Sequence, residues 1–418
     1  MFILNTIIIK SKPLQSLKKP FLSNVPIHSL GISQIIAYGL LFYLFALVKA
    51  PLAAAYGISE IHILSVLSVI VGIQAFLGPV FGYWADSLSA LTVMVFGLLS
   101  GGLGLAFLSF GGELIWLYIG FIFIALGIGG ATYELAFTAA VQLDESKSRK
   151  NISYITFYGA VASSLTWLLV GPMLERFGLS MMLMLLCFTV WVMALRLAWL
   201  AKKTTSHTSK LKNVISRFRW SELQKSEKIA MVLLGLSGGA GYLGFSAAAM
   251  MWITWFDTLY ASATFAVILA SIYGPFQLVG RMMEMIFGSG IDARLTGAIS
   301  SLLVPISIFM AQFENGLISI LAMALFGMGH GVTTVTHGFV TNLYFRSEIY
   351  GRAKGWISLP KTLGLAFGPL AGGLLYHTLG IYFLWSIIAL SLLASPVSYT
   401  HLRAHETGRN LGCRSVHE

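Results

Sequence analysis

Long apolar runs alternate with short polar segments along most of this chain. A helix that crosses the ~30 Å hydrocarbon core of a bilayer needs about 20 mostly apolar residues. The runs are continuous rather than alternating residue by residue, which favours helices over the strands of a β-barrel. We therefore predict an all-α polytopic membrane protein with twelve transmembrane helices, near residues 31–57, 62–85, 90–110, 114–141, 152–174, 179–201, 229–256, 263–288, 296–312, 316–343, 356–376 and 379–395.

The composition agrees with this prediction. The chain is 57% hydrophobic and 10% charged, with a mean hydropathy of +0.81, values typical of polytopic membrane proteins. Its net charge of +11 would fit a nucleic-acid-binding protein, but the basic residues gather in a few connecting segments, as the positive-inside rule expects. Only Cys187 and Cys413 are cysteines, too few for a disulfide framework or a cysteine metal site. We expect no nucleic-acid partner, no metal and no cofactor.

The basic segments also predict the topology. We expect a cytoplasmic N-terminal tail over 1–30, a six-helix half over 31–201, a basic cytoplasmic linker over 202–228 and a second six-helix half over 229–395. Arg176 is the one basic residue among the predicted outer loops. The predicted location is the inner or plasma membrane, multi-pass, with the N-terminus in the cytoplasm, and the chain is expected to act as a monomer.

Three glycine motifs recur in the two halves at an offset of about 200 residues, which indicates two pseudo-symmetric, duplicated halves. Gly82 with Asp86 follows span two, and Gly288 with Asp292 follows span eight. Residues 126–130 of span four match residues 326–331 of span ten. Gly171-Pro172 with Gly178 belongs to span five, and Gly368-Pro369 with Gly380 belongs to span eleven.

The stretch over 355–373 in span eleven combines glycines, prolines and one lysine. Glycines four apart on a helix allow close approach of another helix, and proline can kink a helix. We expect Gly364, Gly368 and Pro369 to serve packing between the halves and hinge motion, and Lys361 to carry the chemistry of this helix.

These motifs resemble those of the major facilitator superfamily over roughly residues 30–395. Gly82, Ala85 and Asp86 match its Gly-x-Leu-Ala-Asp-Arg-x-Gly-Arg-Arg signature, but serines and an alanine replace the usual arginines. That departure puts the family's Asp–Arg contact in doubt, and Asp86 could instead cap the next helix. The stretch over 355–373 matches the family's Gly-x8-Gly-x3-Gly-Pro-x2-Gly-Gly pattern, which is usual in span five of antiporters. The resemblance implies the major facilitator fold and a secondary transporter.

Two shorter matches point to branches of that superfamily. Residues 32–43 and 280–284 resemble bacterial relatives of the monocarboxylate porters. An arginine in span eight with a lysine in span eleven resembles the oxalate–formate antiporter branch. Arg281 and Lys361 would then hold a carboxylate, as this resemblance implies.

Four ionisable residues from four spans are predicted to share one layer. Lys361 lies about five residues inside span eleven, roughly 8–10 Å deep at 1.5 Å per residue. Arg281, Glu134 and His337 lie at similar depths. Charged residues inside spans normally face the bundle interior and mark substrate or proton paths.

We assign a carboxylate site to this layer. Arg281 would hold the anion through its planar fork and Lys361 would add a point charge. Glu134, His337 or Glu284 would carry a coupled proton, since burial can shift their protonation towards neutral pH. Alternatives remain at each position: Arg281 could pair with Glu284, Lys361 could snorkel to the interface, and Glu134 could simply pair with a basic neighbour.

His330 and Lys49 complete the predicted substrate site. His330 stands among the glycines of span ten, where it could relay protons or could be a hydrogen-bonded structural residue. Lys49 lies toward the outer half of span one, as either an anion attractor or an interfacial anchor.

The last residues differ from the rest of the chain. Polar sequence follows Ser395-Pro396, and 397–407 resembles a translated sequencing adapter. We expect 396–418 to be artefactual and the twelfth helix to be truncated near Ala394. A natural polar tail is the alternative.

We predict a secondary transporter for a small organic anion, a mono- or dicarboxylate, coupled to protons and working by alternating access in the lipid bilayer. The alternatives are efflux of an amphipathic or hydrophobic compound, and a receptor or sensor built on the same fold. No nucleotide-binding loop or nucleophile motif occurs in the sequence, so an enzyme is not expected.

Overall fold

The computed structural model describes residues 25–208 and 220–394, and these residues form helices joined by short turns with no strand among them. The first half contains α1 (Val25–Tyr38), a π-helical turn η2 (Gly39–Tyr43), α2 (Leu44–Tyr56), α3 (Glu60–Leu88), α4 (Ala90–Leu108), α5 (Leu114–Ala131), α6 (Tyr133–Leu143), η3 (Glu145–Lys147), α7 (Ser148–Ala160) and α8 (Ala162–Thr208). The second half contains η5 (Trp220–Glu222), α9 (Lys225–Tyr260), α10 (Ala263–Ser271), α11 (Tyr273–Phe287), η6 (Gly288–Gly290), α12 (Ala293–Met310), α13 (Gly316–Tyr344), α14 (Tyr350–Leu379), η7 (Gly380–Tyr382) and α15 (Phe383–Ala394).

These elements make twelve spans. Nine helical segments of the described residues are long and apolar enough to cross a membrane. The other three arise where α8 divides in two at Gly178, from the long but less apolar α14, and from the shorter α15. Residues 1–24, 209–219 and 395–418 lie outside the described residues. They include most of the predicted N-terminal tail, part of the linker and all of the expected artefactual tail.

Local sequence signals set the helix boundaries. The side chains of Ser59, Ser262 and Asn315 each accept a hydrogen bond from a backbone N–H in the first turn of the next helix, which satisfies a donor that has no partner within the helix. Gln224 and Glu227 form a reciprocal capping box at the start of α9.

Two glycines mark equivalent turns in the two halves. Gly178 has φ +71° between spans five and six, and Gly380 has φ +55° between spans eleven and twelve. Residues with a Cβ rarely adopt this left-handed conformation, whereas glycine does so readily. The turns support the internal repeat that the glycine motifs predict.

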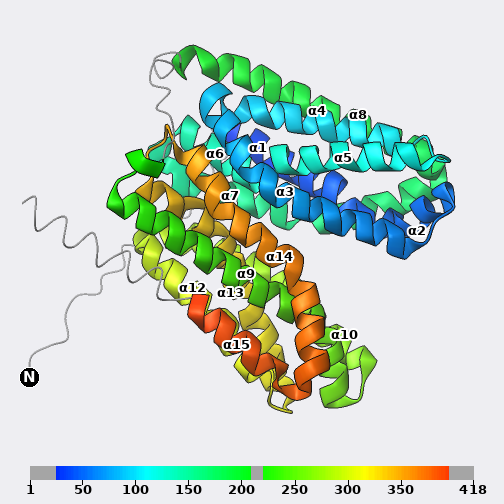
Figure 1. The fold of residues 1–418 in the computed structure, drawn as a ribbon, viewed down its shortest axis with the longest axis vertical. Helices are drawn as coiled ribbons and strands as arrows, with labels where there is room; N and C mark the ends of the chain where they lie inside the picture. Colours follow the sequence, from blue (N-terminus) through cyan, green and yellow to red (C-terminus); the bar gives the residue numbers. More distant parts are fainter. Residues whose placement is uncertain (1–24, 209–219, 395–418) are drawn as a thin grey trace, which may run out of the picture.

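Among the described residues, the two halves make their main contacts at one end. Contacts between them join α3 to α14, α6 to α13 and α14, and α7 to α11 and α13. The α6 and α7 segments flank the loop that carries Lys147, so we call this side the basic end. Figure 1 shows the halves diverging toward the other side, where α2 and α10 lie. We call that side the opposite end.

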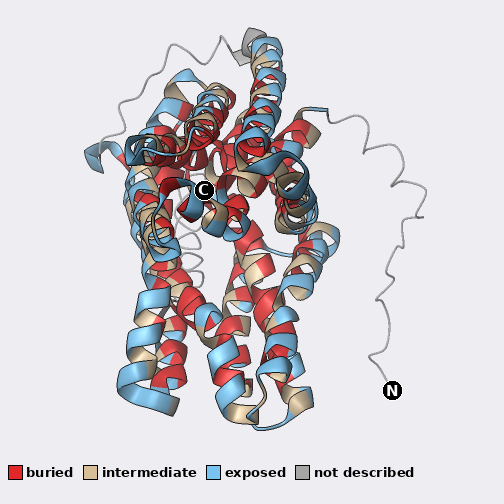
Figure 2. Cartoon of the chain, turned by 90° about the vertical axis from the view of Figure 1, so that its right-hand side faces the viewer, coloured by how far each residue is buried: buried red, intermediate tan, exposed pale blue. Residues whose placement is uncertain are grey.

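Burial follows this arrangement. Figure 2 shows buried residues where helices face one another and exposed residues on the outside. Many exposed side chains are large and apolar, such as Phe96, Leu168 and Phe188. An apolar exterior of this kind is the surface that a protein presents to lipid.

Candidate functional site

A break in span four positions the central carboxylate. Backbone dihedrals at Thr132 are extended, so α5 ends there and α6 begins at Tyr133. The Thr132 hydroxyl donates to the carbonyl of Ile128 at 2.8 Å. Glu134 consequently lies in the first turn of α6, where the helix dipole stabilises a negative charge.

Two lysines of α14 share the Glu134 carboxylate. Lys361 Nζ lies 2.6 Å from Oε1 and Lys354 Nζ lies 3.3 Å from Oε2. Lys354 also donates to the carbonyl of His337 at 2.6 Å. The side chain of Lys354 is 2% exposed, and those of Lys361 and Glu134 are 17% and 22% exposed. Because α6 belongs to the first half and α14 to the second, the carboxylate joins the two halves.

Arg281 lies in the same region, on α11. Its Nη1 donates to the Tyr133 hydroxyl at 3.1 Å and to the carbonyl of Thr156 at 2.7 Å. The residue is 5% exposed, and Arg281 forms no ion pair with a carboxylate of the described residues. Its Nε is buried without a hydrogen-bond partner.

The charges of this group do not cancel. We use the name charged cluster for Glu134, Arg281, Lys354 and Lys361. Three cations and one carboxylate leave two positive charges in a largely buried place. Buried charge without a counter-ion is costly, so the charged cluster is suited to accept an anion.

Aromatic and imidazole rings surround the charged cluster. Lys361 Nζ lies 5.2 Å from the ring centroid of Tyr242, and that ring is 5.8 Å from both His330 and His337. His330 Nδ1 is hydrogen-bonded to the Tyr273 hydroxyl at 2.5 Å and to Gln277 at 3.0 Å. The cationic groups therefore lie beside polar rings, and His330 is held in a hydrogen-bonded network.

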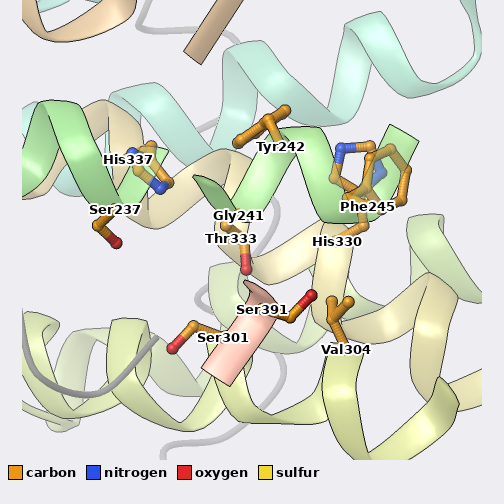
Figure 3. Close-up of a pocket in the computed structure, with 10 residues that line it drawn as sticks. All are labelled: Ser237, Gly241, Tyr242, Phe245, Ser301, Val304, His330, Thr333, His337 and Ser391. Atoms are coloured by element: carbon orange, nitrogen blue, oxygen red, sulfur yellow. The ribbon is translucent and has the colours of Figure 1, made fainter. Parts of the chain in front are cut away.

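Both histidines also line a small cavity inside the second half (Figure 3). Its volume of about 40 Å³ is enough for one or a few water molecules. The lining residues come from α9, α12, α13 and α15 and are Ser237, Gly241, Tyr242, Phe245, Ser301, Val304, His330, Thr333, His337 and Ser391.

Asp86 closes the basic end on one side. Its oxygens accept from the backbone N–H of Gly351 at 2.8 Å and of Arg352 at 2.9 Å, and the Arg352 guanidinium lies 3.3 Å away. The carboxylate of one half thus caps α14 of the other half, while Ser89 caps the next helix, α4. The expectation that Asp86 caps the next helix is wrong, because the nearest free backbone donors belong to α14.

Glu284 closes the basic end on the other side. It pairs with Arg149 of α7 at 2.7 Å, so it does not neutralise Arg281. The Arg149 guanidinium also donates to the carbonyl of Ile291 at 2.5 Å and to the Thr296 hydroxyl at 3.1 Å. We call the Asp86–Arg352 and Glu284–Arg149 contacts the two latches.

The other predicted motif residues lie elsewhere. Lys49 is 3.5 Å from Glu60 near the opposite end, and both are exposed. Asp292 caps α12 and lies 3.2 Å from Arg294 of the same half. A Cβ on Gly288 would meet the Glu284 carboxylate, so this glycine leaves room for one latch.

The packing predicted for span eleven needs a correction. Gly364 and Gly368 were expected to pack between the halves, but a Cβ on either would meet Gly239 or Ser246 of α9, within the second half. Pro369 is accommodated inside the continuous helix α14. The close approach between halves is made by residues nearer the basic end, where Gly82 lies against Gly351 and Gly78 against Gly355.

Comparison with known proteins identifies the fold. No model of a protein family matches the sequence, and no curated protein matches it. Solved structures do match. They include the proton:xylose symporter XylE bound to 6-bromo-6-deoxy-D-glucose (TM-score 0.68, 16% identity, 90% of this chain and 96% of that chain) and the human organic anion transporter MFSD10 (TM-score 0.66, 14% identity, 90% and 98%).

A bacterial homologue of the iron transporter ferroportin in an outward-facing state is also similar (TM-score 0.70, 16% identity, 90% of this chain and 99% of that chain). The coverage shows that residues of both halves take part in the likeness. At these identities the likeness shows the fold, which is the major facilitator fold of two six-helix halves.

Proposed function

We propose that this chain is a secondary active transporter for a small organic anion and works by alternating access. The observation that carries the proposal is the surplus of two positive charges in the charged cluster, at the place where helices of both halves meet. The fold supports transport, because the similar structures are transporters by name. One of them, MFSD10, is an organic anion transporter.

Arg281 and Lys361 are the proposed anion-binding residues. The planar guanidinium of Arg281 matches a carboxylate in two-point geometry. Lys361 is the more exposed of the two lysines on Glu134, so it can turn toward a substrate while Lys354 keeps its contact with Glu134. Arg281 bridges α11 to α7 through the carbonyl of Thr156. Anion binding there would compete with a contact between the halves.

Glu134 is the proposed proton carrier. Protonation would remove the only negative charge of the charged cluster, release both lysines and raise the net charge from two to three. A higher positive charge strengthens anion binding. The proton and the anion would therefore favour each other, as symport requires, and the reciprocal coupling follows from linkage.

The conformation supports alternating access. The two latches and the shared carboxylate hold the basic end closed, and the halves diverge at the opposite end (Figure 1). A change to the alternative conformation, open at the basic end, would break these contacts and close the opposite end around a site between the halves. The orientation, with the basic end in the cytoplasm, stays a prediction from the charges.

Uptake into proteoliposomes tests the proposal. Radiolabelled lactate and oxalate are offered with and without an alkaline interior, and Arg281→Ala is compared with Arg281→Lys. We expect Arg281→Ala to lower anion uptake about 100-fold, in line with removal of one partner of a buried charge contact. Arg281→Lys should keep part of the activity, since it keeps the charge without the fork.

Arg176→Ala is the matched control, because this exposed arginine lies near the opposite end, away from the charged cluster. It should transport like the wild type. The proposal would be contradicted if the wild-type protein took up no anion but exported an amphipathic dye, and if Arg281→Ala left that energised efflux unchanged. This result would favour an exporter.

A further inference from the structure

A groove runs along the outer surface of the first half, between α1, α7 and α8. Its volume of about 800 Å³ lies within the usual range for ligand sites, about 300–1,000 Å³. It lies apart from the charged cluster, with which it shares no residue. The lining residues are Val25, His28, Ser29, Ile32, Ile36, Tyr158, Phe188, Thr189, Val192, Met193 and Arg196.

The groove is polar at one end and apolar at the other. The α1 helix begins at the basic end and α8 ends there, so the two helices are antiparallel. Arg196 Nε lies 3.3 Å from the Ser29 hydroxyl, and His28 Nδ1 lies 2.8 Å from the Tyr158 hydroxyl. Ile36 of α1 and Phe188 of α8 line the end farther from the basic side. A ligand that fits both ends must be amphipathic.

The length of the groove corresponds to one leaflet. Val25 to Ile36 spans about 16 Å of helix at 1.5 Å per residue, roughly half of the ~30 Å hydrocarbon core. Ile32, Val192 and Phe188 are 44%, 48% and 66% exposed. In a membrane these side chains face acyl chains, so the groove opens to lipid.

Among the described residues, the helices that line the polar end of the groove carry only positive charge there. Neither α1 nor α7 contains Asp or Glu, and α8 contains none after Gly178. Arg196 forms no ion pair with a carboxylate of the described residues, and its guanidinium stacks 5.0 Å from the ring centroid of Trp199. Lys203 lies 3.9 Å from the same ring. Trp and basic residues together are typical of the headgroup level of a bilayer.

We propose that this groove binds an anionic phospholipid from the leaflet at the basic end. The phosphate would lie beside Arg196, and one acyl chain would lie along Ile32, Ile36 and Phe188. The lipid would touch Tyr158, two residues from Thr156, whose carbonyl holds Arg281. A lipid in the groove therefore steadies the helix that carries one partner of a latch, Arg149.

Retention of lipid by the purified full-length protein tests the proposal. The detergent-solubilised protein is mixed with phosphatidylglycerol or phosphatidylcholine of identical chains, and bound lipid is counted by native mass spectrometry. We expect the wild type to keep one phosphatidylglycerol in preference to phosphatidylcholine. Arg196→Gln should reduce that preference at least 5-fold. Val192→Trp should reduce retention of both lipids, because the indole fills the path of the acyl chain.

Two controls keep the result interpretable. Arg176→Gln removes a cation just before the break at Gly178, near the opposite end and outside the groove, and should leave the preference unchanged. Glycerol 3-phosphate, which has the phosphate without acyl chains, should not displace the lipid. Three results would each overturn the proposal. The wild type could retain the two lipids equally, or Arg196→Gln and Arg176→Gln could lose the preference for phosphatidylglycerol to the same extent. Val192→Trp could also change the oligomeric state of the protein without losing lipid.

Discussion

Glu134 forms ion pairs with two lysines of one helix, of which Lys361 also donates a hydrogen bond to it, and this sharing determines what each lysine can do. Lys354 is nearly fully buried and is also bound to the carbonyl of His337, whereas Lys361 is more exposed and lies beside Tyr242. Removing the carboxylate charge leaves two buried ammonium groups close together, at a cost of about 3–5 kcal/mol when nothing else compensates. An anion can supply that compensation.

Glu134→Gln should therefore separate anion binding from proton coupling. Glutamine imitates the protonated carboxylic acid, so we expect exchange of anion across the membrane to continue while accumulation driven by a pH gradient falls about 10-fold or more. Both activities are measured in the same proteoliposomes. Glu60→Gln, which changes the exposed partner of Lys49, is the control. A response of Glu134→Gln to the pH gradient equal to that of the wild type would contradict the assignment.

At the scale of elements, α14 packs against two different neighbours along its length. Near the basic end its glycines meet α3 of the first half, and farther along they meet α9 of its own half. Small residues allow such close helix contacts without side chains between the backbones. The first contact must separate when the basic end opens, while the second can persist. We infer that α14 moves with α9 as one unit.

Gly82→Ala should open the basic end. The added Cβ would collide with the backbone carbonyl of Gly351, which cannot rotate away as a side chain can. Spin labels at the exposed Glu145 and Arg346, in a background without Cys187 and Cys413, report the distance between halves by pulsed EPR. We expect a population with a longer distance to appear or grow.

Gly72→Ala on the same helix is the control, because nothing lies within 4 Å of the Cβ that it adds. It should give the wild-type distance distribution. Identical distributions for Gly82→Ala and the wild type would show that this contact does not limit closure.

At the scale of the whole molecule, two latches hold the basic end closed. Each joins an acid at the end of the second span of one half to an arginine at the start of the fifth span of the other half. Asp86 is completely buried and Glu284 nearly so, so solvent screens these pairs less than exposed ones. The combined stabilisation from the two ion pairs favours the conformation described here, closed at the basic end, over one that is open at that end.

Loss of both latches should shift this balance more than loss of either. Asp86→Asn, Glu284→Gln and the double variant are each made in an Ile357→Cys background. Ile357 is buried on α14, and the rate at which a thiol reagent modifies the introduced cysteine is measured. We expect faster modification in each variant and the fastest in the double variant, with roughly additive free energies because the pairs share no residue. Asp292→Asn, whose ion pair lies within one half, should react at the wild-type rate. Unchanged rates in the double variant would refute a role in closure.

The sequence predicted the spans, the repeat and part of the charged cluster. Depth along a helix follows from residue counts, so Lys361 and Glu134 could be placed in one layer, and they are in contact. The predicted span 356–376 leaves Lys354 outside the membrane, but α14 begins at Tyr350, six residues before that span, and carries Lys354 inside. Partners such as Arg149 and Glu284 are 135 residues apart, and no periodicity encodes which distant helices meet.

The reciprocal form of the two latches has a consequence for the origin of the chain. When two identical subunits meet across a two-fold axis, residue i of one contacts residue j of the other, and the same contact occurs twice. Here an acid near the end of the second span meets an arginine at the start of the fifth, once in each direction. The two acids do not occupy matching positions of the repeat, because Asp292, not Glu284, lies at the position that corresponds to Asp86. The two halves would therefore have kept a two-fold pattern of contact after duplication, while each took its acid from a different position near the end of the second span.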